Sequence, residues 1–154
     1  MVWLNDLIRN PFLITAVSSW ALAQVIKTVI HALLFKKLDW KRLFGDGGMP
    51  SGHSATVASL ATICALISGT GSAAFAISAV LAIIVCHDAM GVRLETGKQA
   101  IVINDLLSAD GEMVKDPSFA ETKLKEFVGH TPMQVLAGIL LGIATALAMH
   151  TWVF

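Results

Sequence analysis

Four long apolar runs constrain this chain more than any other feature. They cover residues 11–35, 51–69, 72–92 and 132–153, and a helix that crosses a bilayer needs about 20 such residues. The second run is short and spans only if its helix begins at Pro50 or Ser51. A soluble helical bundle is the alternative, but 11 acidic and 11 basic residues are too few to cover four such helices with polar surface. The sequence therefore predicts an all-α polytopic membrane helix bundle, one integral membrane domain over 1–154, with four spans plus interfacial helices.

The connections between the runs fix how the spans follow one another. The "SGTGS" stretch at 68–72 is long enough only for a tight turn, so the second and third spans are expected to be antiparallel. The polar segment 93–129 is expected to hold an amphipathic interfacial helix and a short helix that begins at Ser118. This connectivity brings the end of the first run, both ends of the polar segment and the start of the second run to one membrane face.

Most basic residues also fall on that face, and the positive-inside rule makes it cytoplasmic, with both termini outside. The chain is expected in the plasma membrane, as a bacterial inner-membrane protein whose first run is a retained anchor. The net charge of zero gives no indication of nucleic-acid binding. Nine of the 11 Lys and Arg residues lie on this face: Lys36, Lys37, Lys41, Arg42, Arg93, Lys98, Lys115, Lys123 and Lys125.

The stretch "GGMPSGHSAT" at 47–56 is typical of a helix start that can bind an anion. Ser51 can cap the helix, and the first backbone N–H groups of a helix carry partial positive charge that favours phosphate. Gly52 lets a ligand approach the backbone closely, and His53 can exchange a proton near neutral pH. The alternative is a capped helix with an incidental histidine.

A second stretch, "GHTPMQVLAGILLG" at 129–142, places His130 before the cap of the last span. Gln134 could reach the His130 ring, or it could serve only in a capping box with Thr131. Two histidines with cations at one helix mouth suit phosphoryl transfer, in which one imidazole attacks phosphorus and the other protonates the leaving oxygen. This chemistry requires no metal and no cofactor, and the histidines lack the close spacing of metal ligands.

Together these stretches resemble the type-2 phosphatidic acid phosphatase superfamily, which includes the vanadium-dependent haloperoxidases. The blocks "GGMPSGHSA", "DAMGVRLETGKQA" and "GHTPMQVLAGILLG" are similar to its divergent, small bacterial and plant branch, over about residues 20–145. The resemblance implies a histidine nucleophile that forms a phosphohistidine, a histidine general acid, and phosphate ligands beside them. The matching positions are His130 as nucleophile, His53 as general acid, and Ser51, Gly52 and Arg93 as phosphate ligands.

The sequence departs from the superfamily pattern in three places. Its first motif, a lysine followed by an arginine-proline pair, is absent, and Lys27 is the first-choice substitute, with Arg42 second. The polar segment separates Arg93 from His130 as an insertion or lid. Gln134 replaces an acidic residue that would stabilise an imidazolium, which predicts weaker activity. Asp88 remains open between an ion pair with Lys27, an ion pair with Arg93, and a solvated position.

The leading functional hypothesis is a metal-independent phosphatase that hydrolyses a lipid phosphate monoester or pyrophosphate at the cytoplasmic leaflet. The alternative is a catalytically weak or inactive relative that binds anionic lipid or a membrane partner, which the missing first motif and Gln134 favour. Vanadate-dependent halide oxidation is a third possibility, disfavoured because such relatives are soluble and much larger. Relatives use about six core helices, so a homodimer is one way to complete the packing.

Overall fold

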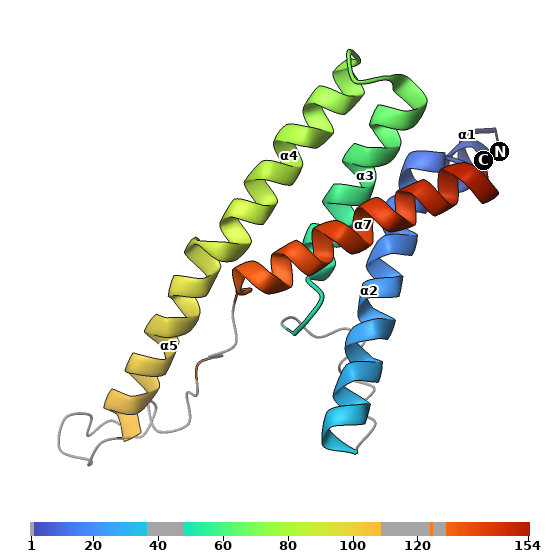
Figure 1. Ribbon diagram of the computed structural model, residues 1–154. Helices are drawn as coiled ribbons and strands as arrows, with labels where there is room; N and C mark the ends of the chain where they lie inside the picture. Colours follow the sequence, from blue (N-terminus) through green and yellow to red (C-terminus); the bar gives the residue numbers. More distant parts are fainter. Residues whose placement is uncertain (1, 37–47, 109–123, 125–128) are drawn as a thin grey trace.

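The computed structural model describes residues 2–36, 48–108, 124 and 129–154, and Figure 1 shows these as a bundle of helices. The prediction of an all-α membrane helix bundle is confirmed within these residues. The helices are α1 (Val2–Ile8), α2 (Pro11–Phe35), α3 (Gly52–Ser68), α4 (Ala73–Met90), α5 (Val92–Ser108) and α7 (Pro132–Trp152).

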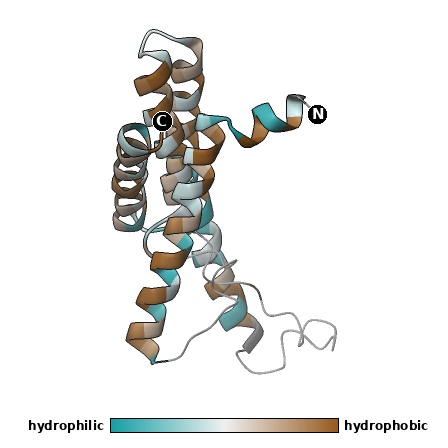
Figure 2. Ribbon diagram, turned by 90° about the vertical axis from the view of Figure 1, so that its right-hand side faces the viewer, coloured by the Kyte–Doolittle hydropathy of each residue, from teal (hydrophilic) through white to brown (hydrophobic). Residues whose placement is uncertain are grey.

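Length and hydropathy mark three stretches of helix as able to cross a membrane. They are Pro11–Phe35, Ala73–Leu106 and Pro132–Trp152, and the shorter Gly52–Ser68 is also apolar. Hydrophobic residues spread along these helices in Figure 2. After Gly91, α5 continues in nearly the direction of α4 rather than turning across it (Figure 1). The first half of the polar segment is therefore an extension of the third apolar helix.

Each long helix except α5 begins at a side chain that caps its first turn. Asn10 Oδ1 accepts hydrogen bonds from two backbone N–H groups at the start of α2, and Ser72 caps α4. The predicted caps at Ser51 and Thr131 are confirmed, and Thr131 forms the predicted capping box. Caps of this kind fix where a helix starts, and the caps at Ser51 and Thr131 therefore fix which residues stand at the starts of α3 and α7.

Helix α3 lies at the centre of the bundle and packs against α2, α4 and α7. The closest approach is to α7, where a Cβ atom on Gly138 would lie 2.5 Å from the Ser51 carbonyl oxygen, and one on Gly142 would collide with the Ala55 carbonyl oxygen. From the other side, Ser19 Oγ of α2 donates to the Ala55 carbonyl oxygen at 3.1 Å. The glycines let two helix backbones touch, as small residues do inside membranes.

Two sequence predictions fall outside the described residues. The first is Arg42 as the second-choice cation for the missing first motif. The second is the short helix expected to begin at Ser118, of which only Leu124 and the end at Gly129 are described. Leu124 is held by the side chain of Asn104 in α5, which donates to the Leu124 carbonyl at 2.9 Å and accepts from its N–H at 3.0 Å.

Candidate functional site

The two histidines singled out in the sequence meet in the structure. The ring centroids of His53 and His130 are 6.4 Å apart, and the ring planes lie at 89° to each other. His53 is the second residue of α3 and is exposed, whereas His130 precedes the cap of α7 and is only 5% exposed. The His130 N–H donates to the Ala89 carbonyl oxygen of α4 at 3.0 Å. Three helices therefore hold the pair.

Lys27 of α2 reaches the start of α3. A Cβ atom on Gly52 would lie 3.9 Å from Lys27 Nζ, and one on Gly48 would lie 3.2 Å from Lys27 Cγ. Lys27 is 7% exposed, and it precedes Lys36 at the end of α2 by about 13 Å of helix. The start of α3, residues 48–53, is its mouth, and this mouth lies at the depth of Lys27 rather than at the end of α2. The buried ammonium and the positive end of the α3 helix dipole therefore both attract an anion to this mouth.

Ser51 ties the starts of α3 and α7 together. Its backbone N–H donates to the Gln134 carbonyl oxygen at 3.0 Å. Its fully buried hydroxyl oxygen accepts from Ser54 N at 3.3 Å and from Ser54 Oγ at 3.0 Å. The Ser51 side chain therefore caps α3, and the N–H groups of Gly52 and His53 point out of the helix end, as such groups do.

The Gln134 side chain is engaged by the backbone beside it. Its Oε1 atom accepts from the Thr131 N–H at 3.0 Å, and the Gln134 N–H donates to Thr131 Oγ1 at 3.4 Å. Of the two roles left open for Gln134, the structure contains the capping box, with the side-chain oxygen on Thr131 rather than on the His130 ring.

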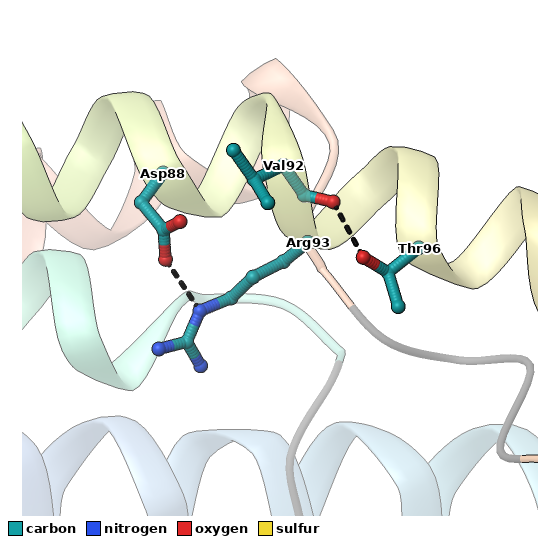
Figure 3. A network of polar contacts seen from close by, with 4 residues as sticks. All are labelled: Asp88, Val92, Arg93 and Thr96. Atoms are coloured by element: carbon teal, nitrogen blue, oxygen red, sulfur yellow. Dashed lines mark hydrogen bonds and ion pairs between the residues drawn. The ribbon is translucent and has the colours of Figure 1, made fainter.

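Arg93 pairs with Asp88, which resolves the position left open for that carboxylate. Arg93 Nε lies 2.6 Å from Asp88 Oδ2, and the two side chains are 52% and 40% exposed (Figure 3). The insertion after Arg93 returns to it at Gly129. A Cβ atom on Gly129 would lie 2.6 Å from the Arg93 carbonyl carbon, and Gly129 has a φ of 99°. The backbone at Arg93 and the backbone at Gly129 and His130, which are distant in sequence, therefore lie side by side in the structure.

Two residues of α2 were missed by the sequence reasoning. The Trp20 Cδ1 atom would lie 3.5 Å from a Cβ atom on Gly52, so the indole stands over the mouth of α3. Gln24 is 8% exposed, and its Oε1 atom has no hydrogen-bond partner among the described residues. The sequence pattern that could have identified them is their spacing from Lys27. Gln24 follows Trp20 by four residues and precedes Lys27 by three, which puts all three on one helix face.

The chemistry available at this mouth is that of anion binding with proton transfer. Two imidazoles, a buried ammonium and outward helix N–H groups converge there. In the part of the chain that the structure describes, no group of three His, Cys, Asp or Glu side chains is placed to hold a metal ion.

Comparison with known proteins gives two matches that cover most of the chain. A family model described as "Divergent PAP2 family" matches residues 8–145. The uncharacterized membrane protein YuiD of Bacillus subtilis (strain 168) is 41% identical over 152 residues, which cover 94% of this chain and 96% of that protein. No solved structure matches the chain.

Proposed function

The chain belongs to the divergent PAP2 family, and from that premise we propose that it is a metal-independent phosphatase of lipid phosphates. The proposed substrate class is a lipid phosphate monoester or pyrophosphate, because the site lies among helices that are long and apolar enough to cross a membrane. The observation that carries the proposal is the contact between His53 and His130 at the start of α3. A nucleophile and a proton donor must face one phosphorus atom, and two facing imidazoles fit that need.

In the first step, a nitrogen of His130 attacks phosphorus and the bond from phosphorus to the leaving oxygen breaks. His53 gives a proton to that oxygen, so an alcohol or a phosphate leaves and a phosphohistidine remains. The Gly52 and His53 N–H groups and Lys27 stabilise the charge on the nonbridging oxygens. Lys27 is the cation assigned to this role, because its ammonium lies beside Gly52.

In the second step, water attacks the phosphohistidine and His53 accepts the proton from that water. The bond between phosphorus and the His130 nitrogen breaks, inorganic phosphate leaves, and both imidazoles return to their first state. Ser51 serves this cycle as the cap that fixes the N–H groups of α3, and Asp88 serves it by holding the Arg93 side chain.

A second candidate function is binding of anionic lipid without turnover. The observation that favours it is the use of Gln134 Oε1 by the Thr131 N–H, at a position where the superfamily pattern has an acidic residue that would stabilise an imidazolium. Such a protein would bind a lipid phosphate at the same mouth and release no phosphate.

The site is assigned to the cytoplasmic face of the plasma membrane. The support is the excess of Lys and Arg in the sequence segments 36–42 and 93–125, which precede α3 and α7, together with the membrane description of the 41% identical relative.

Release of phosphate from a panel of lipid phosphates, in detergent with a chelator present, tests the proposal. We expect turnover by the wild type, and a loss of more than about 1,000-fold in His130→Ala and His53→Ala. His150→Ala is the matched control, because His150 lies at the other end of α7, and it should keep wild-type turnover. Lipid phosphate binding with no release by the wild type would favour the second candidate function.

A further inference from the structure

An apolar groove lies against α3 between α2 and α4. Its volume is about 300 Å³, and Val17, Trp20, His53, Thr56, Val57 and Val85 line it. Val17 and Trp20 come from α2 and Val85 from α4, while the other three come from α3. The groove therefore has two walls from neighbouring helices and a floor from the central one.

The groove occupies the side of α3 that α7 leaves uncovered. Successive residues of a helix are turned by about 100°, so His53, Thr56 and Val57 share one face. The glycines of α7 contact the opposite face, at Ser51, Ser54, Ala55, Ala58 and Ser59. Since α3 packs against both α2 and α4, these two helices flank the uncovered face.

The lining suits hydrocarbon. Its walls belong to α2 and α4, which are candidate membrane spans, and Val17 is 60% exposed. The Thr56 hydroxyl donates to the Gly52 carbonyl oxygen at 2.8 Å, so its hydrogen-bonding capacity is used within the helix. His53 is the one ionisable side chain among the six lining residues. The groove is thus an apolar channel that ends at one imidazole of the candidate site.

We infer that this groove holds the hydrocarbon chain of the leaving alcohol. The inference rests on the proposed function, in which His53 protonates the leaving oxygen. His53 lines the groove, whereas its partner His130 is almost fully buried on the α4 and α7 side. In-line displacement puts the leaving group opposite the nucleophile, so the group that leaves lies on the groove side.

The substrate class that fits is a lipid phosphate in which the chain-bearing alcohol is bonded directly to phosphorus. His130 forms its bond to phosphorus, the bond to the alcohol oxygen breaks, and the His53 proton goes to that oxygen. The alcohol then returns to the bilayer and phosphate leaves through the polar mouth after hydrolysis.

The groove contributes by positioning the hydrocarbon chain of the substrate rather than by increasing the affinity for that chain. A chain that moves from bilayer to groove gains little hydrophobic free energy, because lipid is as apolar as the lining. A volume of about 300 Å³ is at the lower end of ligand pockets, which fits one chain. A seated chain aligns the alcohol oxygen with His53, and such alignment raises the rate of the chemical step.

The first test compares a short-chain with a long-chain alkyl phosphate in wild type, Val17→Phe and Val29→Phe. Val29 is the matched control, an exposed valine of α2 outside the groove lining. The wild type and Val29→Phe should prefer the long chain, and Val17→Phe should lose about tenfold or more on the long chain alone. Equal activity of all three proteins on both substrates would overturn the inference and leave the proposed function standing.

The second test needs no turnover. Trp20 is kept as the one tryptophan, the other three being changed to phenylalanine, and its fluorescence is followed as an alkyl phosphonate with a brominated chain is added. We expect the quenching to saturate and to be reversed when vanadate is added. The brominated alcohol, which lacks the phosphonate, should not quench. The quenching should be lost in Val17→Phe and kept in Val29→Phe. Saturable quenching with no hydrolysis of any substrate would remove the proposed phosphatase and keep the groove. Quenching that does not saturate, or that is unchanged in Val17→Phe, would overturn the groove as the chain site.

Discussion

At the scale of single residues, the polar groups of the site are explained by where they lie in the bundle. A lysine within an apolar helix is costly in lipid, and Lys27 is placed instead beside the first turn of α3. Its ammonium adds a full charge to the partial charge of the helix end. Gly52 has no side chain, so the space between the Lys27 ammonium and the first turn of α3 stays open. An added Cβ atom at Gly52 would fill that space at ordinary contact distance from Trp20 and Lys27.

Gly52→Ala should separate folding from function. The added methyl group meets Trp20 at 3.5 Å and Lys27 Nζ at 3.9 Å, so the thermal unfolding midpoint should stay near that of the wild type. The same methyl group occupies the place assigned to a phosphate oxygen, so phosphate release should fall on the order of 100-fold. A variant that unfolds normally and turns over normally would remove Gly52 from the site.

Gln134→Glu should raise turnover, by up to about tenfold. Glutamate suits the same capping-box position, so the start of α7 should remain intact, and its carboxylate adds negative charge near the His130 imidazolium. Gln134→Ala is the control for the cap and should lower stability by about 1 kcal/mol. The comparison uses steady-state phosphate release with thermal unfolding, and a drop in turnover for Gln134→Glu would contradict this role.

At the scale of helices, the close packing of α3 and α7 brings the two histidines together. The Ser51 N–H bonds to the Gln134 carbonyl, and Gly138 stands directly on the Ser51 carbonyl oxygen. The start of one helix is therefore fixed against the start of the other. Because His53 lies at the start of α3 and His130 just before the start of α7, this contact also fixes the position of the two imidazoles relative to each other.

Gly138→Ala should weaken this alignment. Its Cβ atom would lie 2.5 Å from backbone, which must shift, and overpacking of this kind costs about 1–3 kcal/mol of stability. Gly71→Ala is the matched control, since no atom lies within 4 Å of its added Cβ, and stability there should change by less than about 0.5 kcal/mol. Thermal unfolding in detergent checks both, and equal midpoints would show that α7 has room to move.

Local and connective features of this arrangement could be predicted from sequence. Ser51 and Thr131 cap helices through contacts with residues three positions away. Chain connectivity alone puts His53 and His130 at one membrane face. The choice among the alternatives left open for Asp88, the groove and the role of Trp20 could not be predicted. Each depends on how deeply and at what rotation one helix packs against another, which the pattern within a single helix does not fix.

At the scale of the whole molecule, the chain termini and the candidate site lie toward different ends of the bundle. Both termini lie at the same end of the bundle in Figures 1 and 2, and the candidate site lies toward the other end, where α3 and α7 begin. The polar insertion leaves and re-enters the bundle beside the site, at Arg93 and Gly129.

Cysteine labelling in intact cells should report which side that is. Gln99→Cys on α5 lies on the side of the site, and Gly71→Cys lies in the turn between α3 and α4. A maleimide that cannot cross membranes should label Gly71→Cys in intact cells, and should label Gln99→Cys only after the cells are broken. The native Cys64 and Cys86 are buried and should stay unlabelled. The reverse pattern would place the site outside.

The proposed reaction requires a phosphoryl group to pass through His130, and trapping that intermediate tests it most directly. An aryl phosphate is used, because its leaving group needs no proton, and His53→Ala is used, because it lacks the base that activates water for the second step. After an alkaline quench, mass spectrometry should find a phosphohistidine at residue 130 in His53→Ala, and none when His130→Ala is added. A phosphoryl group on another residue, or turnover by the wild type with no trapped adduct in His53→Ala, would contradict the account.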